Sequence, residues 1–458
     1  MTARDHAVRS GVATLGDPGL QGGSGIDRVR GLRLLLITAS SPGIRRVRSS
    51  RFLSFQQITM PYLAALTSPG WDVEHVDEEA EEIDFDADVD LVGMTFHTPS
   101  ARHAYDVAAR FRARGVSVVA GGPHVTLLPE EAADHYDAVF VGESESTWPR
   151  FLEDFARGRV AKVYRSDGYQ SLEGVPQSVK RLFHRRDLTG GVLFATRGCP
   201  CRCDFCSLAV TYGSKQRRRP VAEVAAEYAS FQGKVIIFWD ENIVADPEYA
   251  KELFRAITPA RKWWSSQASV DAGRDDELLE LAARSGCKQL FLGLESVSQA
   301  SLNAVHKRFN VVEEYGRIIG RIHSHGIAVQ AGIVFGFDRD TPAIFSETLA
   351  FLERAGVQNA TFNILTPYPG TPLFRRLEEE GRILTTDWNR YNGRADVVFR
   401  PKHMSCEELL AGFHWANRRF YSLASISRRL HRSPVGLWWT LPLNLAYRSR
   451  SPRMRRPS

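Results

Sequence analysis

Two series of short apolar runs, separated by segments with helical spacing, are the feature of this sequence that most limits its fold. The runs of the first series are 32–38, 71–77, 90–96, 116–122 and 137–143. Strands that alternate with helices at short spacing are typical of a parallel sheet with helices on both faces. We therefore predict that the first part of the chain folds as an α/β, doubly wound, Rossmann-like sheet.

A second series of apolar runs begins at residue 191. Its runs are 191–198, 234–240, 263–270, 288–295, 328–337 and 359–367. Strand and helix repeats of this kind predict a partial (βα)6 barrel, whose active site would lie at the carboxyl ends of the strands. From residue 405 the pattern becomes helical and then basic.

These patterns divide the chain into five predicted segments. Residues 1–30 are rich in Gly, Ser and Arg without periodicity, so we expect them to be disordered. The N-terminal sheet is predicted at 31–157, and a surface linker at 158–190. The barrel is predicted at 191–400, followed by a helical region with a basic tail at 401–458.

The positive charge of the chain is concentrated at its C-terminal end. The formal net charge is +6, and no Asp or Glu follows Glu408, whereas Arg continues to the end. With Trp415, Trp438 and Trp439, this stretch suits an anionic membrane surface, a nucleic acid or a simple helical cap. Because it contains no RNA-binding motif, we do not expect a nucleic acid as its partner.

Targeting signals are not evident in this sequence. The N-terminus lacks the apolar segment of a signal peptide, and no apolar run reaches the length of a membrane span. We therefore expect a cytoplasmic protein, with peripheral contact to the inner face of the membrane through the basic tail as a further expectation.

A cluster of cysteines is the strongest indication of chemistry. Four of the six cysteines lie between 199 and 206, and Cys199, Cys203 and Cys206 have the spacing C-x3-C-x2-C. Iron–sulfur clusters are held by Cys thiolates, normally four. Three ligands would leave one iron open to an amine and a carboxylate of a bound molecule. A structural zinc site is the alternative, but it would require a second Cys or His pair, which does not follow.

The other three cysteines have less distinctive surroundings. Cys201 lies between the expected ligands, and it is a bystander, a misassigned ligand or a thiol near the substrate. Cys287 precedes a predicted strand, and Cys406 begins a predicted helix. We expect both to be structural.

The segment RGCPCRCDFC (197–206), including Phe205 before the last cysteine, resembles the signature of the radical S-adenosylmethionine (SAM) superfamily. The resemblance implies a [4Fe–4S] cluster that cleaves SAM to a 5′-deoxyadenosyl radical, which takes a hydrogen atom from the substrate. The ends of later strands resemble the SAM-contacting positions of this superfamily. The residues implied as SAM contacts are Asp240, Glu241, Asn242, Glu295, Ser296, Gly336 and Pro367.

Glycines at the ends of the N-terminal strands would let a bulky planar ligand approach the backbone. The segments 118–132 and 137–146 resemble the cobalamin-binding (B12-binding) domain found in front of many radical SAM cores. The contacts to cobalamin implied by this resemblance are His97, Thr98, Gly121, Gly122, His124, Gly142 and Glu143. The loop 38–46 contains no His, so we expect base-off cobalamin without a histidine lower ligand.

The resemblance implies a cobalamin-dependent radical SAM enzyme, most commonly a class B methyltransferase that methylates an unactivated carbon. We expect a small-molecule or lipid substrate and an electron donor such as flavodoxin or ferredoxin. Three alternatives remain open. They are cyclisation, rearrangement or oxidation with the same cofactors, modification of tRNA or protein without cobalamin, and a non-catalytic corrinoid or redox sensor.

Overall fold

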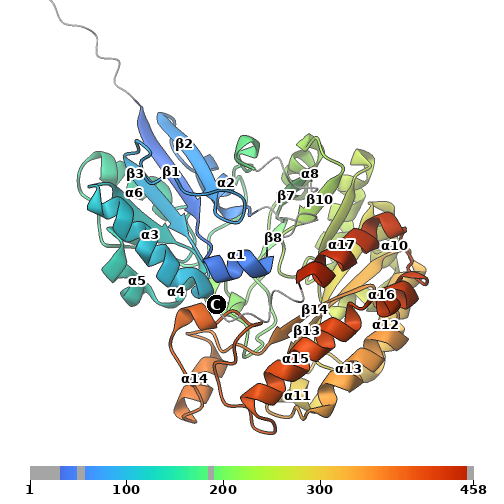
Figure 1. Cartoon of the computed structure of the whole chain (residues 1–458). Helices are drawn as coiled ribbons and strands as arrows, with labels where there is room; N and C mark the ends of the chain where they lie inside the picture. The colour runs from blue at the N-terminus through green and yellow to red at the C-terminus, as the bar shows by residue number, and fades with distance from the viewer. Residues whose placement is uncertain (1–30, 49–56, 184–189, 451–458) are drawn as a thin grey trace, which may run out of the picture. The chain divides into compact units, whose positions relative to one another are not determined.

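The computed structural model describes residues 31–48, 57–183 and 190–450 (Figure 1). The disorder predicted for residues 1–30 therefore lies outside the described residues. From Leu32 onward the chain forms one compact unit. This unit contains two parallel sheets and a short antiparallel ribbon.

The first sheet has six parallel strands. They lie in the order β2 (Trp71–Asp77), β1 (Leu32–Thr38), β3 (Leu91–Thr95), β4 (Ser117–Gly121), β5 (Ala138–Val141) and β6 (Val163–Arg165). The strand order reverses between β1 and β3, and in such sheets ligands bind outside the carboxyl ends of the strands at this point.

Both faces of the first sheet are buried by helices. The flanking helices are α1 (Pro42–Arg48), α2 (Thr59–Ala65), α3 (Ala101–Ala113), α4 (Pro123–Leu127), α5 (Pro129–His135) and α6 (Thr147–Ala156). Leu34 and Leu36 of β1 join the core formed with α2 and α6, whereas Leu35 and Ile37 join the core formed with α3 and α5. This alternation explains the continuous apolar run at 32–38 and confirms the predicted doubly wound sheet.

The second sheet is the predicted partial barrel, and it also has six parallel strands. Their order is β14 (Asn359–Ile364), β13 (Ala328–Phe335), β12 (Cys287–Glu295), β11 (Trp263–Ala268), β10 (Val235–Phe238) and β7 (Gly191–Leu193). Its helices are α8 (Val221–Ser230), α9 (Pro247–Ile257), α10 (Asp276–Arg284), α11 (Gln299–Ala304), α12 (Tyr315–Ser324) and α13 (Ala343–Arg354). One large apolar core joins these strands and helices.

Two local features differ from the sequence expectations. The run 191–198 is not one strand, because after β7 the chain leaves the barrel and forms β8 (Thr196–Arg197), which pairs antiparallel with β9 (Arg217–Arg218). The segment 158–190, expected to be a linker, contains β6, which extends the first sheet. A strand of three residues is too short to produce a readable alternation. The domain limits themselves stay a prediction.

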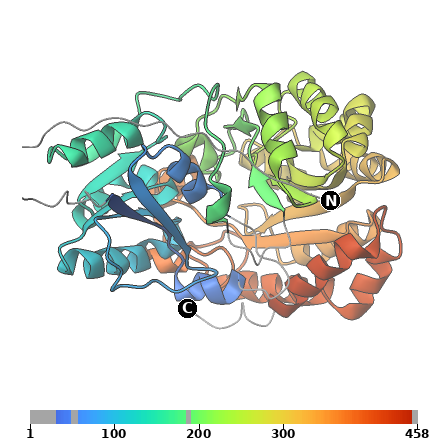
Figure 2. The same cartoon turned by 90° about the horizontal axis from the view of Figure 1, so that it is seen from above.

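The C-terminal region is helical, as its pattern predicts. It contains α15 (Cys406–Phe420), α16 (Leu423–Leu430) and α17 (Leu437–Arg450), whereas α14 (Pro372–Glu379) precedes it. Helices α15 and α17 contact β14, and Figure 2 shows the red C-terminal helices beside the orange barrel strands. Among the described residues, no helix is both long enough and apolar enough to cross a membrane.

Candidate functional site

A cavity of about 540 Å³ is lined by residues that follow strands of both sheets. From the first sheet, the loop after β1, the loop after β3 and the glycines Gly121, Gly122 and Gly142 contribute to its wall. From the barrel side, Thr196, Arg197, Trp239 and Glu241 contribute. The cavity therefore lies at the edges where ligands bind in both kinds of sheet.

A second cavity of about 900 Å³ shares His97, Pro99 and Arg394 with the first. It is lined by α1, by the short 3₁₀ turn Thr98–Ser100 and by residues between 387 and 396. Of the predicted cobalamin contacts, His97 borders both cavities with an exposed side chain, and Thr98 borders the second.

The end of β4 requires glycine for a steric reason. Gly122 has φ +100°, and a Cβ at this position would lie 2.3 Å from the hydroxyl oxygen of Thr95. The backbone of Gly121, Gly122 and Gly142 thus forms part of the cavity wall without side chains. This edge of the first sheet leaves room for a large ligand.

His124 does not line either cavity. It is fully buried, its Nδ1 lies 3.2 Å from the hydroxyl of Thr98, and its Nε2 lies 3.0 Å from the hydroxyl of Tyr105. Glu131 accepts hydrogen bonds from Tyr105 at 2.9 Å and from the Trp388 indole at 2.9 Å. We expected His124 to contact cobalamin, but these contacts direct its ring away from the cavities, toward a buried polar cluster behind the loop.

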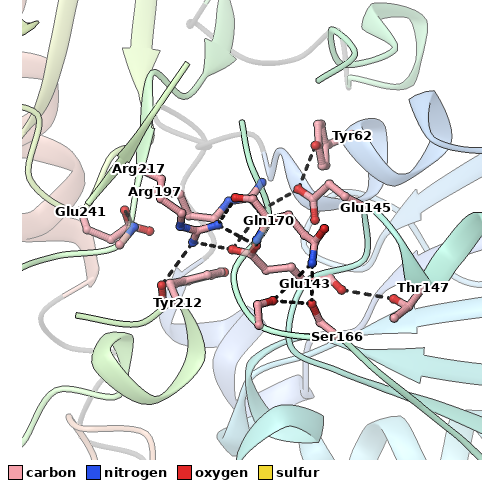
Figure 3. Close-up of polar contacts among 12 residues, drawn as sticks. Tyr62, Glu143, Glu145, Thr147, Ser166, Gln170, Arg197, Tyr212, Arg217 and Glu241 are labelled. Atoms are coloured by element: carbon pink, nitrogen blue, oxygen red, sulfur yellow. Dashed lines mark hydrogen bonds and ion pairs between the residues drawn. The ribbon is translucent and has the colours of Figure 1, made fainter. Parts of the chain in front are cut away.

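Four charged residues, one of them buried and three partly buried, join the first sheet to the β8–β9 ribbon (Figure 3). Glu143 accepts two hydrogen bonds from Arg217, at 2.5 and 2.7 Å, and a third from the backbone N–H of Gln170 at 2.9 Å. Arg197 donates to Glu145 at 2.6 Å and lies 3.3 Å from Glu143. We call Glu143, Glu145, Arg197 and Arg217 the Glu–Arg clasp.

The Glu–Arg clasp neutralises two arginines that would otherwise repel each other. Arg197 and Arg217 are directly opposite each other in the β8–β9 ribbon, and like charges at such positions destabilise a strand pair. Burial raises the pKa of Glu143, but the hydrogen bonds of Arg217 and the charge of Arg197 outweigh it and lower this pKa below its ordinary value. Glu143 is therefore ionised, and both of its carboxylate oxygens are engaged by protein groups rather than turned toward a ligand.

Sequence reasoning missed Glu145, Arg197 and Arg217, and it gave Glu143 a different role. The hydroxyl of Tyr62, also missed, donates to Glu145 at 2.9 Å. Two signals were present: the paired acids of GESES (142–146) after an apolar strand, and Arg197 just before the first expected ligand. Neither signal identifies a partner, because the partners lie 52 to 83 residues away in the chain.

Asp240 organises the chain that enters the cysteine loop. Its buried carboxylate accepts hydrogen bonds from the backbone N–H of Ala195 at 3.1 Å and from both the N–H and the hydroxyl of Thr196 at 2.6 Å. Burial raises the pKa of Asp240 to about 6 in spite of these bonds. By capturing these two amides, Asp240 ends the β7 ladder and explains why the chain leaves the barrel at this point.

The two residues after Asp240 have separate positions. Glu241 lines the first cavity and accepts from the backbone N–H of Gly198 at 3.2 Å; burial, with the charge of Asp240, raises its pKa to about 7. Asn242 is buried and accepts from the backbone N–H of Ser269 at 2.9 Å. We expected all three residues to contact SAM, and Glu241 is the one that reaches the cavity.

The four clustered cysteines lie on the loop between β8 and α7 (Leu208–Thr211), and all are free thiols. A hydrogen bond from Cys201 lowers the pKa of Cys199 to about 6, whereas burial raises the pKa of Cys203 to about 11 and that of Cys206 to about 12. Each of these pKa values is also influenced by a neighbouring thiol of the loop, so the side chains lie close to one another.

The donor set of this loop fits an iron–sulfur cluster better than a single ion. Within 31–48, 57–183 and 190–450, no three His, Cys, Asp or Glu side chains are placed to hold one metal ion. A cluster does not require its ligands to converge on one point, because each thiolate binds a different iron. Neighbouring free thiols on one loop, without a disulfide, satisfy that weaker requirement.

The end of β12 faces the cysteine loop. Glu295 accepts a hydrogen bond from Lys307 at 2.9 Å, and both charges influence the pKa of Cys203. Glu295 has φ +64°, a left-handed conformation that is unfavourable for a residue with a side chain. Strain of this kind concentrates at functional sites. Ser296 is buried beside it and accepts from the backbone N–H of Ser298 at 3.1 Å.

The last two predicted SAM contacts lie farther along the barrel edge. Gly336 follows β13 with φ +103°, and its N–H donates to Asp340 at 2.9 Å. Pro367 is buried in the loop after β14. Neither residue lines the two cavities described above.

Family comparisons agree with this geometry. The model "Radical SAM superfamily" matches residues 193–352, "B12 binding domain" matches 48–152, and a domain of unknown function matches 371–435. The bacteriochlorophyllide d C-12(1)-methyltransferase of Chlorobaculum tepidum is 30% identical over 86% of this chain and 89% of its own length. The hopanoid C-2 methylase of Rhodopseudomonas palustris is 26% identical over 74% of this chain and 67% of its own length.

The fold has a close counterpart among solved structures. The radical SAM methyltransferase TsrM from Kitasatospora setae, with cobalamin and a [4Fe-4S] cluster bound, superposes with a TM-score of 0.68. The match has 16% sequence identity and covers 93% of this chain and 98% of that one. Fold and matches together define an enzyme of the radical SAM superfamily. Within it, this chain belongs to the family of radical SAM enzymes with a B12-binding domain that includes these methyltransferases.

Proposed function

We propose that this protein is a cobalamin-dependent radical SAM enzyme that methylates an unactivated carbon of a small molecule or lipid. The proposal is carried by one observation. The glycine edge of the first sheet and the segments that enter and leave the cysteine loop, including Arg197 and Tyr212, line the same cavity. A corrin on one side and a cluster with SAM on the other would thus share one reaction space.

When bound, the reduced cluster would supply the electron that cleaves SAM to a 5′-deoxyadenosyl radical, and cobalamin would supply the methyl group. The protein holds and orients these groups. Cys199, Cys203 and Cys206 would bind three irons and leave the fourth open to SAM. Asp240 and Glu241 hold the backbone just before the first of these cysteines.

The proposed SAM contacts are Asp240, Glu241, Asn242, Glu295, Ser296, Gly336 and Pro367. Glu295 has the strongest support, because its backbone is strained and its carboxylate lies near the cysteine loop, where it could accept from an amine or a ribose hydroxyl. The proposed cobalamin contacts are His97, Thr98, Gly121, Gly122, His124, Gly142 and Glu143. Among them the glycines would provide room, whereas His124 and Glu143 would act by supporting the loops.

The substrate and the partners of the protein are proposed as broad chemical classes. Relatives named as a bacteriochlorophyllide methyltransferase and a hopanoid methylase support a small-molecule or lipid substrate. The cluster would need a one-electron donor such as flavodoxin or ferredoxin. We keep a cytoplasmic location as part of the proposal, with peripheral contact to the membrane through the C-terminal region.

The test is anaerobic purification with added cobalamin, followed by iron, sulfide and corrinoid analysis and a SAM-cleavage assay under dithionite. Four irons, bound corrinoid and 5′-deoxyadenosine are the expected result. Iron and cleavage without corrinoid would overturn the role of the first sheet, and zinc without iron would overturn the role of the cysteines. With a substrate in hand, a mass increase of one CH2 supports methylation, and any other mass change supports cyclisation, rearrangement or oxidation.

A further inference from the structure

The outer face of helix α17 is apolar. Leu437 is 54% exposed, Trp438 is 52% exposed and Leu445 is 41% exposed. Residues four apart share one face of a helix, so Leu437, half-buried Leu441 and Leu445 form a stripe with Trp438 beside it. The inner side of this stripe contacts the barrel, because Leu441 packs against its core and the Trp438 ring lies 4.4 Å from that of Trp263. We call Leu437, Trp438, Leu441 and Leu445 the outer stripe.

The inner face of the same helix is mixed, with the apolar Leu443 and Ala446 buried beside the polar Thr440 and Asn444. Asn444 is fully buried, donates to the carbonyl oxygen of Gln358 at 3.2 Å and to the side chain of Asn359 at 2.7 Å, and accepts from Arg429 at 3.1 Å. One turn later, the Tyr447 hydroxyl accepts from the Gln330 amide at 3.0 Å. The barrel thus satisfies the Asn444 amide and the Tyr447 hydroxyl, both of which α17 turns toward it.

An ordinary surface helix turns its apolar stripe to the core and its polar face to water, whereas α17 has apolar side chains on both faces. Single exposed apolar side chains are common and need no explanation, whereas a stripe along one helix indicates an interaction surface. Leucines on the outer face as well as the inner face are the arrangement expected of a helix whose outer face meets an apolar phase.

The charges around α17 indicate which kind of surface its outer stripe would meet. Arg448 is exposed on α17, exposed Arg432 precedes the helix, and the sequence has no Asp or Glu after Glu408. An apolar stripe with Trp, bordered by Arg and free of acids, matches the interface of a bilayer with anionic headgroups. A water-soluble protein partner would not require this one-sided charge.

The same helix also reaches the candidate active site. Tyr447 and Arg450, in its last turn, line the cavity shared by both sheets. We propose that α17 is a membrane-docking helix, which lays its outer stripe on an anionic lipid surface and admits a lipid-phase substrate along its last turn. This inference deepens the function proposed above, on which both the membrane contact and the choice of substrate rest.

The test uses the full chain, purified anaerobically with its cofactors, in flotation with vesicles of phosphatidylcholine alone or mixed with phosphatidylglycerol. We expect flotation with the anionic vesicles, weakened by salt, and a loss of about tenfold in the double variant W438S/L445S. The matched control is W415S, because Trp415 on α15 is also exposed, at 41%, but lies outside the outer stripe. This control should float as the wild type does.

Equal flotation of W438S/L445S and wild type, or no flotation at all, would overturn the proposal. A wild-type dimer that becomes monomeric in W438S/L445S would also overturn it, because a second copy would then cover the stripe. Iron content and circular dichroism establish that each variant is folded. Flotation is read independently of SAM cleavage, so a docking failure and a failure of the proposed chemistry give different results.

Discussion

The carboxyl edges of the two sheets use opposite means to build one cavity. In the first sheet the edge is formed by the backbone of Gly121, Gly122 and Gly142, and its buried polar residues satisfy one another behind the surface. In the barrel the edge carries Asp240 and other charged side chains, which bond to the backbone of the cysteine loop. The first edge provides space, and the second provides rigidity. Changes at the two edges should therefore fail in different ways.

The largest effect is expected at the cysteine loop. Cys203→Ala should reduce iron content and abolish 5′-deoxyadenosine formation, because a cluster with two remaining protein ligands is not retained. Cys201→Ala is the matched control and should keep its iron, since we assign no iron to that thiol. Iron analysis and SAM cleavage check both variants. Loss of iron in the Cys201 variant alone would show that the ligands were misassigned.

A change at the glycine edge of the first sheet should alter the binding of cobalamin rather than that of the iron–sulfur cluster. Gly122→Val should lower corrinoid content at least about tenfold while iron is retained, because its side chain would collide with Thr95 and distort the loop. Gly115→Val is the control, since Gly115 has φ +80° but nothing lies within 4 Å of a Cβ there. Corrinoid bound equally by both variants would contradict the assignment of this edge.

The Glu–Arg clasp connects the edges of the two sheets, so its loss should change how the two bound cofactors are positioned relative to each other. Glu143→Gln should cost about 3–5 kcal/mol of stability, because it leaves the largely buried Arg217 without its counter-charge and Arg197 with Glu145 alone. It should also lower the product formed per 5′-deoxyadenosine by about tenfold, since misplacement of reacting groups is costly.

The control for this change is Glu227→Gln, which breaks the 2.6 Å pair of Glu227 and Arg219 in the barrel part of the chain, a pair that is more deeply buried than the clasp. It should lose a similar amount of stability but keep the wild-type ratio of product to 5′-deoxyadenosine. If both variants change the ratio alike, the clasp contributes stability alone. Chemical denaturation and single-turnover product analysis supply the two measurements.

The smallest effect concerns the polar cluster behind the glycine edge. Although burial raises it, the His124 ring 3.6 Å away and the hydrogen bonds from Trp388 and Tyr105 lower the pKa of Glu131 to about 2 from its ordinary value of 4.5. A folded-state pKa below the unfolded value adds stability that is fully present above about pH 4.5 and is lost as the pH falls toward 2.

Glu131→Gln should therefore cost about 1 kcal/mol near pH 7, since the carboxylate is partly exposed to water. The difference from wild type should shrink as the pH falls through 4.5. Urea denaturation across this range checks the slope. A difference that does not vary with pH would mean that the carboxylate contributes no charge to the cluster.

Sequence patterns predicted the parts of this molecule that depend on local chemistry. Apolar runs such as 32–38 and 328–337 identified strands buried on both faces, and the spacing of Cys199, Cys203 and Cys206 identified the loop. The end of β7 could not be foreseen, because it is fixed by Asp240, which lies 45 residues beyond the amide that it captures. The Glu–Arg clasp was not predicted, for the same reason. Contacts between residues far apart in the chain leave no periodic signal.

The Glu–Arg clasp has a consequence for the order in which this chain is made. Glu145 precedes Arg197 by 52 residues, and Glu143 precedes Arg217 by 74 residues. Because domains fold as units while synthesis proceeds from the N-terminus, the anionic half of the clasp leaves the ribosome before its cationic partners exist. The acids of the first sheet are therefore already in place when Arg197 and Arg217, on either side of the cysteine loop, emerge.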